Sequence, residues 1–365
     1  MNRWLKEIID ILLTPMSWIY GVVIVMRNKF FDWGFLKQHK FDIPVLVVGN
    51  INVGGTGKTP HVEYIVEHLC TENRIAVLSR GYKRKTKGFV LATKKTTTAD
   101  IGDEPYQIYR KFGNMVTVAV CEDRCAGINK LLEINPDLDL VILDDAFQHR
   151  YVKPTVSVVL VDYYNHPVDT DHLLPRGRLR EPHHGLLRAD YVIVTKCPTE
   201  IKPVDISITK KRLDLFPSQK LYFSTLKYFN LIPIFPETVD ILPSLKNFTH
   251  DDSILIVTGI ANHVPFVKFL KAFKTNIKVI HFEDHHDYNR KDFEFIEKWF
   301  NRLNGKNKYL IVTEKDAVKF SCNPYYPLSL QPHSFYMPIK IGFIDIPHNN
   351  DFIESLKKSI NPAKK

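Results

Sequence analysis

The residues best suited to chemistry lie in the segment VLVVGNINVGGTGKTP, from Val45 to Pro60. An apolar run typical of a β-strand ends there at a glycine-rich turn. The backbone N–H groups of such a turn and the N-terminus of the following helix bind phosphate, a lysine reaches the outer phosphates, and a threonine holds magnesium. Asn52 stands where the consensus has glycine, but asparagine also tolerates a left-handed backbone. The predicted nucleotide-binding residues are Asn52, Val53, Gly54, Gly55, Thr56, Gly57, Lys58 and Thr59.

A second chemical element follows in LDLVILDD, from Leu138 to Asp145. Its apolar residues and terminal acids fit a buried central strand whose carboxyl end opens on a site, which is where open α/β sheets bind ligands. A phosphate loop needs such an acid to hold the magnesium shell or to orient the attacking group. Asp144 and Asp145 are therefore the predicted partners of the loop.

The composition indicates an ordinary globular protein. The chain has 365 residues, 44% of them hydrophobic and 25% charged, which is enough for two domains of typical size. Its five cysteines show no paired spacing for a metal or a disulfide, which suits a reducing cytosol. A net charge of +10 predicts an anionic partner. The basic segment 80–87 and Arg176, Arg178 and Arg180 fit either solvated loops or attraction to anionic lipid or a substrate phosphate.

The N-terminal segment favours a membrane as that partner. Residues Met1 to Lys29 combine cations with Trp4, Trp18 and Tyr20 around an uncharged run from Ile11 to Met26. That run is shorter than the roughly 20 residues of a spanning helix, and no small-residue cleavage site follows it. Aromatic residues and cations at headgroup level instead predict an anchor that lies in the interface. A helical hairpin packed on the protein's own core is the alternative.

Strands and helices are expected to alternate after this segment. The pattern predicts an α/β, P-loop NTPase-like fold with a doubly wound, mostly parallel sheet and a second, smaller α/β domain. A proline-containing stretch at about 222–243 reads as a linker or crossover. The strand-like runs are Val45–Gly49, Ile75–Ser79, Met115–Val120, Leu140–Leu143, Val156–Val161 and Tyr191–Thr195, then Ile254–Thr258, Ile277–Phe282, Tyr309–Thr313 and Phe335–Ile339. The predicted parts are a membrane-associated segment 1–35, a P-loop domain 36–225, a linker 226–245 and a C-terminal domain 246–365.

Several short motifs, taken together, resemble one family. They are GNINVGGTGKTP, SRGYKRKTKG, GDEP, DDAFQHR, LLPRGRLREP, TKCP, TGIAN, DHH and TEKDAVK. In number and order they resemble the tetraacyldisaccharide 4'-kinases, the membrane-associated lipid A 4'-kinases. The resemblance spans most of the chain. It implies transfer of the γ-phosphate of ATP to a sugar hydroxyl of a lipid A precursor.

The resemblance also implies roles for two distant motifs. Asp103 in GDEP resembles the family's catalytic base and Glu104 a further active-site acid, although the residues alone would indicate a helix N-terminus. His285 resembles the histidine that pairs with this base from the second domain. His286 stands next to it and is the other candidate, since adjacent residues of an extended strand point to opposite sides. A metal cluster from Glu283 to Asp287 is the alternative for this segment.

The remaining site residues are implied in the same way. The family's DD-x-F-Q-H element, in which paired carboxylates serve the metal and transition-state alignment, is matched by Asp144, Asp145, Gln148 and His149. Glu181 in RLREP resembles a further magnesium-side or active-site carboxylate. Arg124 resembles the arginine that helps to neutralise the transferring phosphoryl group, although CEDRCAG alone would indicate a solvated helix charge.

The predicted activity is therefore phosphorylation of the 4'-hydroxyl of a tetraacyldisaccharide 1-phosphate with ATP and Mg²⁺. We expect a monomer, peripheral or monotopic, at the cytoplasmic face of the inner membrane. The alternative is a membrane-associated regulatory P-loop NTPase without a lipid substrate. Against it, TKCP at Thr195 lacks the acid of a guanine-specific element, and Gln148 stands where a switch motif needs glycine. The chain has no zinc-finger spacing or RNP-type signature of a nucleic-acid-binding protein.

Overall fold

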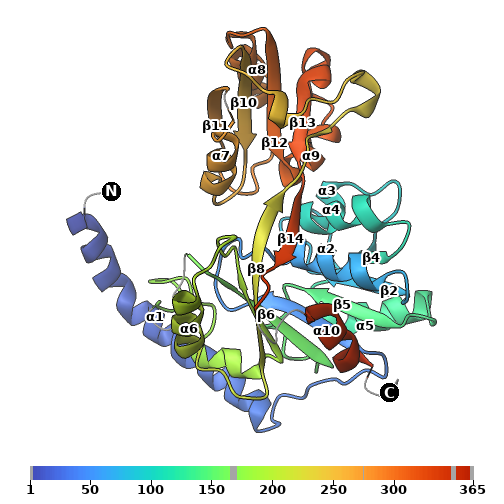
Figure 1. Ribbon diagram of the computed structural model, residues 1–365. Coiled ribbons are helices and arrows are strands. Elements are labelled where there is room, and N and C mark those ends of the chain that lie inside the picture. The colour runs from blue at the N-terminus through green and yellow to red at the C-terminus, as the bar shows by residue number, and fades with distance from the viewer. Residues whose placement is uncertain (1–2, 165–170, 274, 347–350, 362–365) are drawn as a thin grey trace.

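The chain forms two β-sheets, each with helices beside it (Figure 1). The computed structural model describes residues 3–164, 171–273, 275–346 and 351–361. In Figure 1 the smaller sheet lies above the larger one, and the strands β8 and β14 run up from the larger unit toward it. The predicted α/β fold is confirmed.

The larger sheet has nine strands in the order β14-β8-β7-β6-β1-β5-β2-β4-β3. Pairing is parallel from β4 through β8, and only the edge strands β3 and β14 are antiparallel to their neighbours. The strands are β1 (Val45–Asn50), β2 (Ile75–Ser79), β3 (Val90–Leu91), β4 (Thr117–Val120), β5 (Leu140–Asp144), β6 (Val156–Asp162), β7 (Tyr191–Thr195), β8 (Lys220–Tyr228) and β14 (Ile339–Phe343).

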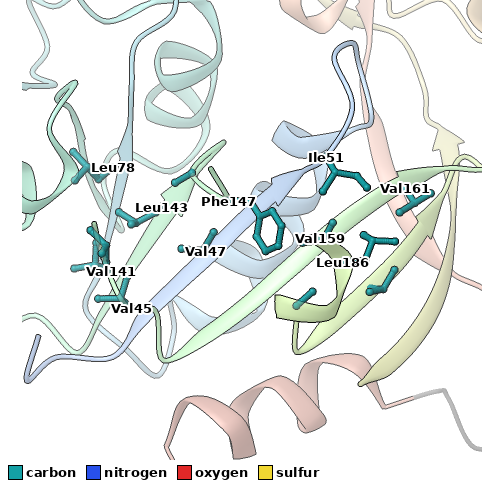
Figure 2. Packing of buried hydrophobic residues seen from close by; sticks show 14 of the residues in the cluster. Val45, Val47, Ile51, Leu78, Val141, Leu143, Phe147, Val159, Val161 and Leu186 are labelled. Atoms are coloured by element: carbon teal, nitrogen blue, oxygen red, sulfur yellow. The ribbon is translucent and has the colours of Figure 1, made fainter. Parts of the chain in front are cut away.

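Helices cover both faces of this sheet, so its central strands are buried from end to end. Side chains alternate between two cores: Val45 and Val47 of β1 pack in one, whereas Leu46 and Val48 pack in the other. Figure 2 shows the first core. The helices are α2 (Lys58–Leu69), α3 (Thr98–Ile101), α4 (Asp103–Phe112), α5 (Arg124–Ile134), η1 (His183–Arg188), α6 (Pro203–Leu213) and α10 (Phe352–Ile360).

The smaller sheet has five strands in the order β11-β10-β12-β13-β9 and two cores of its own. Its strands are β9 (Ile232–Pro233), β10 (Asp252–Thr258), β11 (Asn276–His281), β12 (Asn307–Thr313) and β13 (Ser334–Met337). Its helices are η2 (Pro236–Thr238), η3 (Leu245–Asn247), α7 (Val264–Leu270), α8 (Arg290–Asn301), α9 (Glu314–Ser321) and η4 (Leu328–His333).

Two segments lie elsewhere than the sequence pattern indicated. The stretch expected to be a linker begins inside β8, which pairs with β7 in the larger sheet. After the smaller sheet, β14 returns to pair with β8, and α10 buries Phe352, Leu356 and Ile360 in a core of the larger sheet. We therefore propose domain boundaries that follow the sheets, with residues 229–338 as the smaller domain.

The N-terminal helix α1 (Arg3–Asp32) is continuous through Pro15 and leaves much of its apolar surface exposed. It docks at one flank: Ser17 donates a hydrogen bond to the carbonyl of Leu173 at 2.7 Å, and Tyr20 donates one to the carbonyl of Arg180 at 2.9 Å. Its segment Asp10–Asp32 is long and apolar enough, by length and composition, to cross a membrane. The exposed large side chains include Trp4, Ile11, Leu12, Met16, Trp18, Ile19, Val22, Val23 and Met26.

Candidate active site

The phosphate loop joins β1 to α2 and comprises residues 52–59. Gly54 has a φ of 110° and Gly57 a φ of 87°, both in the left-handed region that glycine adopts without a Cβ clash. Lys58 is the first residue of α2 and Thr59 the second, so their backbone N–H groups are among the free donors at the helix N-terminus. The local geometry is that of an anion-binding turn.

Buried hydrogen bonds support this loop from below. The Asn50 side chain donates to Thr56 Oγ1 at 2.9 Å, and the Thr195 hydroxyl donates to the Thr56 carbonyl at 2.9 Å. His61 Nδ1 lies 2.7 Å from the Gly57 carbonyl oxygen, which can only accept, so this ring nitrogen carries a proton. Burial lowers the pKa of His61 to about 4, and the ring is neutral. The loop therefore rests on polar groups without a charge of their own.

Asp144 and Asp145 stand at the carboxyl end of β5, which is the neighbour of β1 in the sheet. Lys58 Nζ lies 3.6 Å from one Asp145 oxygen, and Arg180 Nη1 lies 2.8 Å from the other. Burial opposes ionisation of Asp145, but the charges of Lys58 and Arg180 outweigh it and hold its pKa below the usual value. Asp145 also has a φ of 48°, a strained backbone of the kind that is found at functional sites.

Asp144 differs from its neighbour in environment. Burial, and then the charge of Asp145, raise the pKa of Asp144 to about 7, while Lys58 acts in the opposite direction. Its Oδ1 atom has no hydrogen-bond partner among the residues that the structure describes. A cation beside the two acids would allow both to ionise. Carboxylate and hydroxyl oxygens are the ligands that Mg²⁺ prefers, so Asp144, Asp145 and Thr59 fit this ion.

Other buried polar atoms of the predicted site also lack partners within the described part of the chain. Both polar side-chain atoms of Asn52, Nε of Arg124 and Nε2 of His149 belong to this group. Buried polar atoms are nearly always hydrogen-bonded, so these unpaired atoms are candidates for contact with a bound ligand. Arg124 is 3% exposed, and burial followed by its charge lowers the pKa of His149 to about 4.

Gln148 and Glu181 belong to a network beside the loop. Gln148 Nε2 donates to the Asn50 carbonyl at 2.8 Å and to Glu181 Oε1 at 2.9 Å. The second Glu181 oxygen accepts from Asn28 of α1 at 3.2 Å and pairs with Arg188. Both oxygens of Glu181 are therefore engaged by protein groups, and Glu181 links α1 to Gln148 and Arg188.

Asp103, beside the larger sheet, contacts His285, beside the smaller sheet. Asp103 is the first residue of α4, and its Oδ2 lies 3.2 Å from His285 Nδ1. His286 instead contacts Asp292 at 3.0 Å. Of the two adjacent histidines, the structure thus brings His285 to Asp103. Because His285 and His286 face different partners, they do not form the alternative metal cluster expected from Glu283 to Asp287.

Glu104 lies close both to this pair and to the acids at the end of β5. It lies beside His285, with 3.6 Å between Oε1 and Nε2, and its charge contributes to the raised pKa of Asp144. An electrostatic effect of this kind requires that the two clusters be close. The acid and histidine pair therefore lies close to the acids beside the phosphate loop.

Comparison with known proteins identifies the family. A family model described as tetraacyldisaccharide-1-P 4'-kinase matches residues 9–361. The chain belongs to this family. The tetraacyldisaccharide 4'-kinase of Bacteroides thetaiotaomicron is 50% identical over 340 residues, covering 91% of this chain and 88% of that protein. The one of Phocaeicola vulgatus is 47% identical over 346 residues, covering 94% and 91%.

A solved structure agrees with this assignment. The crystal structure of LpxK from Aquifex aeolicus in complex with ATP superposes on this 4'-kinase with a TM-score of 0.73 and 28% sequence identity. The match covers 97% of this chain and 99% of that one. The resemblance inferred from the sequence motifs is confirmed, and the chain is a kinase. The roles of the individual site residues stay predictions.

The sequence alone did not place three basic residues of this 4'-kinase among the acids of the predicted site. Arg180 contacts Asp145, Lys319 contacts Asp103 at 2.8 Å, and Lys315 contacts Glu104 at 3.1 Å. Arg180 directly precedes Glu181, and the two lysines are four residues apart in TEKDAVK. Such a spacing places two side chains on one helix face, which was the available signal.

Proposed function

We propose a role for each residue of the site in the reaction of this kinase of lipid A biosynthesis. The reaction transfers the γ-phosphate of ATP to the 4'-hydroxyl of a tetraacyldisaccharide 1-phosphate. The observation that carries the proposal is the contact of Asp103 with His285 close to the acids beside the phosphate loop. One cluster suits a hydroxyl and the other suits a polyphosphate.

The hydroxyl oxygen forms a bond to the γ-phosphorus while the bond from that phosphorus to the β,γ-bridging oxygen breaks, and ADP leaves. The hydroxyl proton passes to the Asp103 carboxylate. The loop amides and Lys58 hold the phosphates, and Arg124 neutralises charge on the transferring group. Such a transfer is largely a matter of positioning and charge neutralisation, which fits a site composed of preset cations and amides.

Asp144, Asp145 and Thr59 would hold Mg²⁺ in this site. When bound, the ion would supply positive charge that neutralises the phosphates. Asp145 already lies between Lys58 and Arg180, so these two side chains set its orientation. We assign Glu181 to the network that positions Gln148, because Glu181 contacts Gln148, Asn28 and Arg188.

The test is transfer of label from ATP labelled at the γ-phosphate to tetraacyldisaccharide 1-phosphate in mixed micelles. We expect label in the lipid, and we expect chelation of divalent cations with EDTA to abolish it. The nucleotide alone, without lipid, is the control for background hydrolysis. Hydrolysis of ATP without label in the lipid would contradict the proposal and support the regulatory NTPase instead.

We further propose that α1 is the membrane anchor, that the protein is a monomer and that it acts at the cytoplasmic face of the inner membrane, where ATP is available. The support is the band of exposed apolar side chains along α1, among them Trp4 at 72% and Trp18 at 71% exposure. Indole rings favour the membrane–water interface.

Deletion of residues Met1 to Lys29 is expected to move the protein from the membrane to the soluble fraction. The apolar surface of α1 supplies most of the binding, and the remaining basic surface attracts anionic lipid only weakly. Sedimentation with vesicles that contain anionic lipid measures this. The full-length chain is the reference, and circular dichroism shows whether the truncated chain is folded. Equal sedimentation of both chains would mean that α1 is not the anchor.

A further inference from the structure

Two neighbouring strands connect the smaller domain to the larger one (Figure 1). The chain leaves the larger sheet after β8 and returns to it in β14, and the Phe229 N–H donates to the Pro338 carbonyl at 3.1 Å where the two passages lie side by side. Such a connection permits rotation, because a few residues at the ends of the strands can absorb the change in backbone angles. Contacts between side chains of the two domains therefore determine how the smaller domain is held.

Many of these contacts join α4 of the larger domain to α9 of the smaller one. The contacts of the first two residues of α4 with lysines of α9 are described above. Two turns further along α4, Arg110 donates to the Ser321 hydroxyl, and Lys111 Nζ lies 2.5 Å from Glu314 Oε1. Glu314 is the first residue of α9 and belongs to the TEKDAVK motif, for which the proposed roles give no function.

Lys111 also binds within the larger domain. Its Nζ lies 2.7 Å from Glu63 Oε2, and the other oxygen of Glu63 accepts from Gln107 Nε2 at 2.8 Å. Glu63 lies on α2, the helix that begins with Lys58 and Thr59 of the phosphate loop. A single ammonium group therefore joins α2, α4 and α9.

Water has little access to this group of charges. The exposed fraction of the side chain is 7% for Glu63, 10% for Glu314 and 28% for Lys111. Burial opposes the charge of Lys111, but the two carboxylates outweigh it and hold the pKa of Lys111 above its ordinary value. Burial raises the pKa of Glu63, while the charge of Lys111 acts in the opposite direction. When Glu63 is neutral, Lys111 and Glu314 form a balanced ion pair across the domain boundary.

We propose that Lys111 and Glu314 are positioning residues that hold the smaller domain against α4 and α2. A buried ion pair adds little net stability to a fold, because the loss of hydration offsets the attraction, but each buried charge requires its partner to be in place. The pair therefore fixes how α9 lies on α4. This inference goes beyond the proposed roles of the site residues, because it holds whichever group accepts the proton.

The position of the smaller domain matters to the site, because His285 and two lysines of α9 reach α4 from that domain. A loosely held domain would bring these side chains to the site for a smaller fraction of the time. Rates depend steeply on such positions, and a displacement of about 1 Å can cost about a hundredfold. Loss of the Lys111–Glu314 pair should therefore lower activity although neither residue belongs to the predicted site.

The first test compares Glu314→Gln with Glu63→Gln, two changes that remove the same charge from the same lysine. Glu314→Gln breaks the ion pair between the domains but leaves Lys111 paired with Glu63, so no buried charge loses its only partner. Glu63→Gln leaves the pair between the domains intact. We expect kcat/KM for the lipid to fall by about tenfold in Glu314→Gln and by less than about twofold in Glu63→Gln, because residues in contact typically show coupling of this size.

The second test measures the distance between the domains and needs no turnover. Spin labels are placed at Lys130 of α5 and Lys298 of α8, which are exposed, through a ketone-bearing amino acid because the chain has five cysteines. Pulsed electron paramagnetic resonance should give one narrow distance distribution for the labelled wild type and for Glu63→Gln. In Glu314→Gln the distribution should broaden toward longer distances.

A role confined to the stability of the fold would make the two carboxylate-to-amide changes alike, and circular dichroism on heating shows how much each one lowers the unfolding temperature. Equal losses of kcat/KM in the two variants, or an unchanged distance distribution in Glu314→Gln, would overturn the inference. Because the distances are measured without substrate, this result does not depend on the proposed role of Asp103.

Discussion

Replacement of Asp103 with alanine is expected to lower kcat for lipid phosphorylation by about 10²- to 10⁴-fold, the usual contribution of a positioned general base. Asp103 is the first residue of α4, and its contacts with His285 and Lys319 orient its carboxylate. The KM for ATP should change little, because the residue lies outside the phosphate loop. Steady-state transfer of label to the lipid measures both constants.

Asp42→Ala serves as the matched control for this substitution. Asp42 is exposed, precedes β1 and is not one of the predicted site residues. This variant should retain the wild-type kcat. A loss below about tenfold in Asp103→Ala would assign proton transfer to another group.

Replacement of Lys58 with methionine is expected to lower kcat by about 10²- to 10³-fold, as for removal of one donor that stabilises transition-state charge. Methionine keeps much of the length of the side chain but removes the ammonium group. Lys58 lies 3.6 Å from Asp145, so its loss also removes a charge that holds that carboxyl ionised. The KM for ATP should rise as well, which distinguishes this variant from Asp103→Ala.

Lys94→Met is the control for the loss of a lysine, because Lys94 is exposed and lies outside the phosphate loop. Binding of a fluorescent ATP analogue to each variant separates affinity from turnover. If Lys58→Met bound the analogue normally and turned over at the wild-type rate, the phosphate loop would not be the site of transfer.

Much of the architecture follows from local patterns. Buried parallel strands require continuous apolar runs, and such runs predicted the central strands of the larger sheet. The phosphate loop was also predicted from the sequence, because its glycines and its lysine have a characteristic spacing. The return of β14 and α10 to the larger sheet was not predicted, since pairing between β8 and β14 depends on a contact between residues more than a hundred positions apart.

Some residues of the predicted site could likewise be recognised from local sequence, and others could not. Nothing near Arg124 in the sequence indicates that its guanidinium is buried, and only the resemblance to a family singled it out. Adjacent residues such as His285 and His286 look alike in a sequence, and their partners Asp103 and Asp292 separate them only in space. Lys315 and Lys319 of α9 contact Glu104 and Asp103 of α4. Their spacing indicates that the two lysines share one helix face, but it does not indicate which residues that face contacts.

The docking of α1 also affects how a soluble version of this enzyme would behave. Asn28 of α1 binds Glu181, Arg27 donates to the Gln148 carbonyl and Tyr20 donates to the Arg180 carbonyl. Removal of the helix to ease purification would therefore take away three hydrogen bonds beside the predicted site together with the proposed membrane anchor. An inhibitor screen on such a truncated enzyme would select compounds against a loosened pocket. Detergent-solubilised full-length protein is the sounder target for drug discovery.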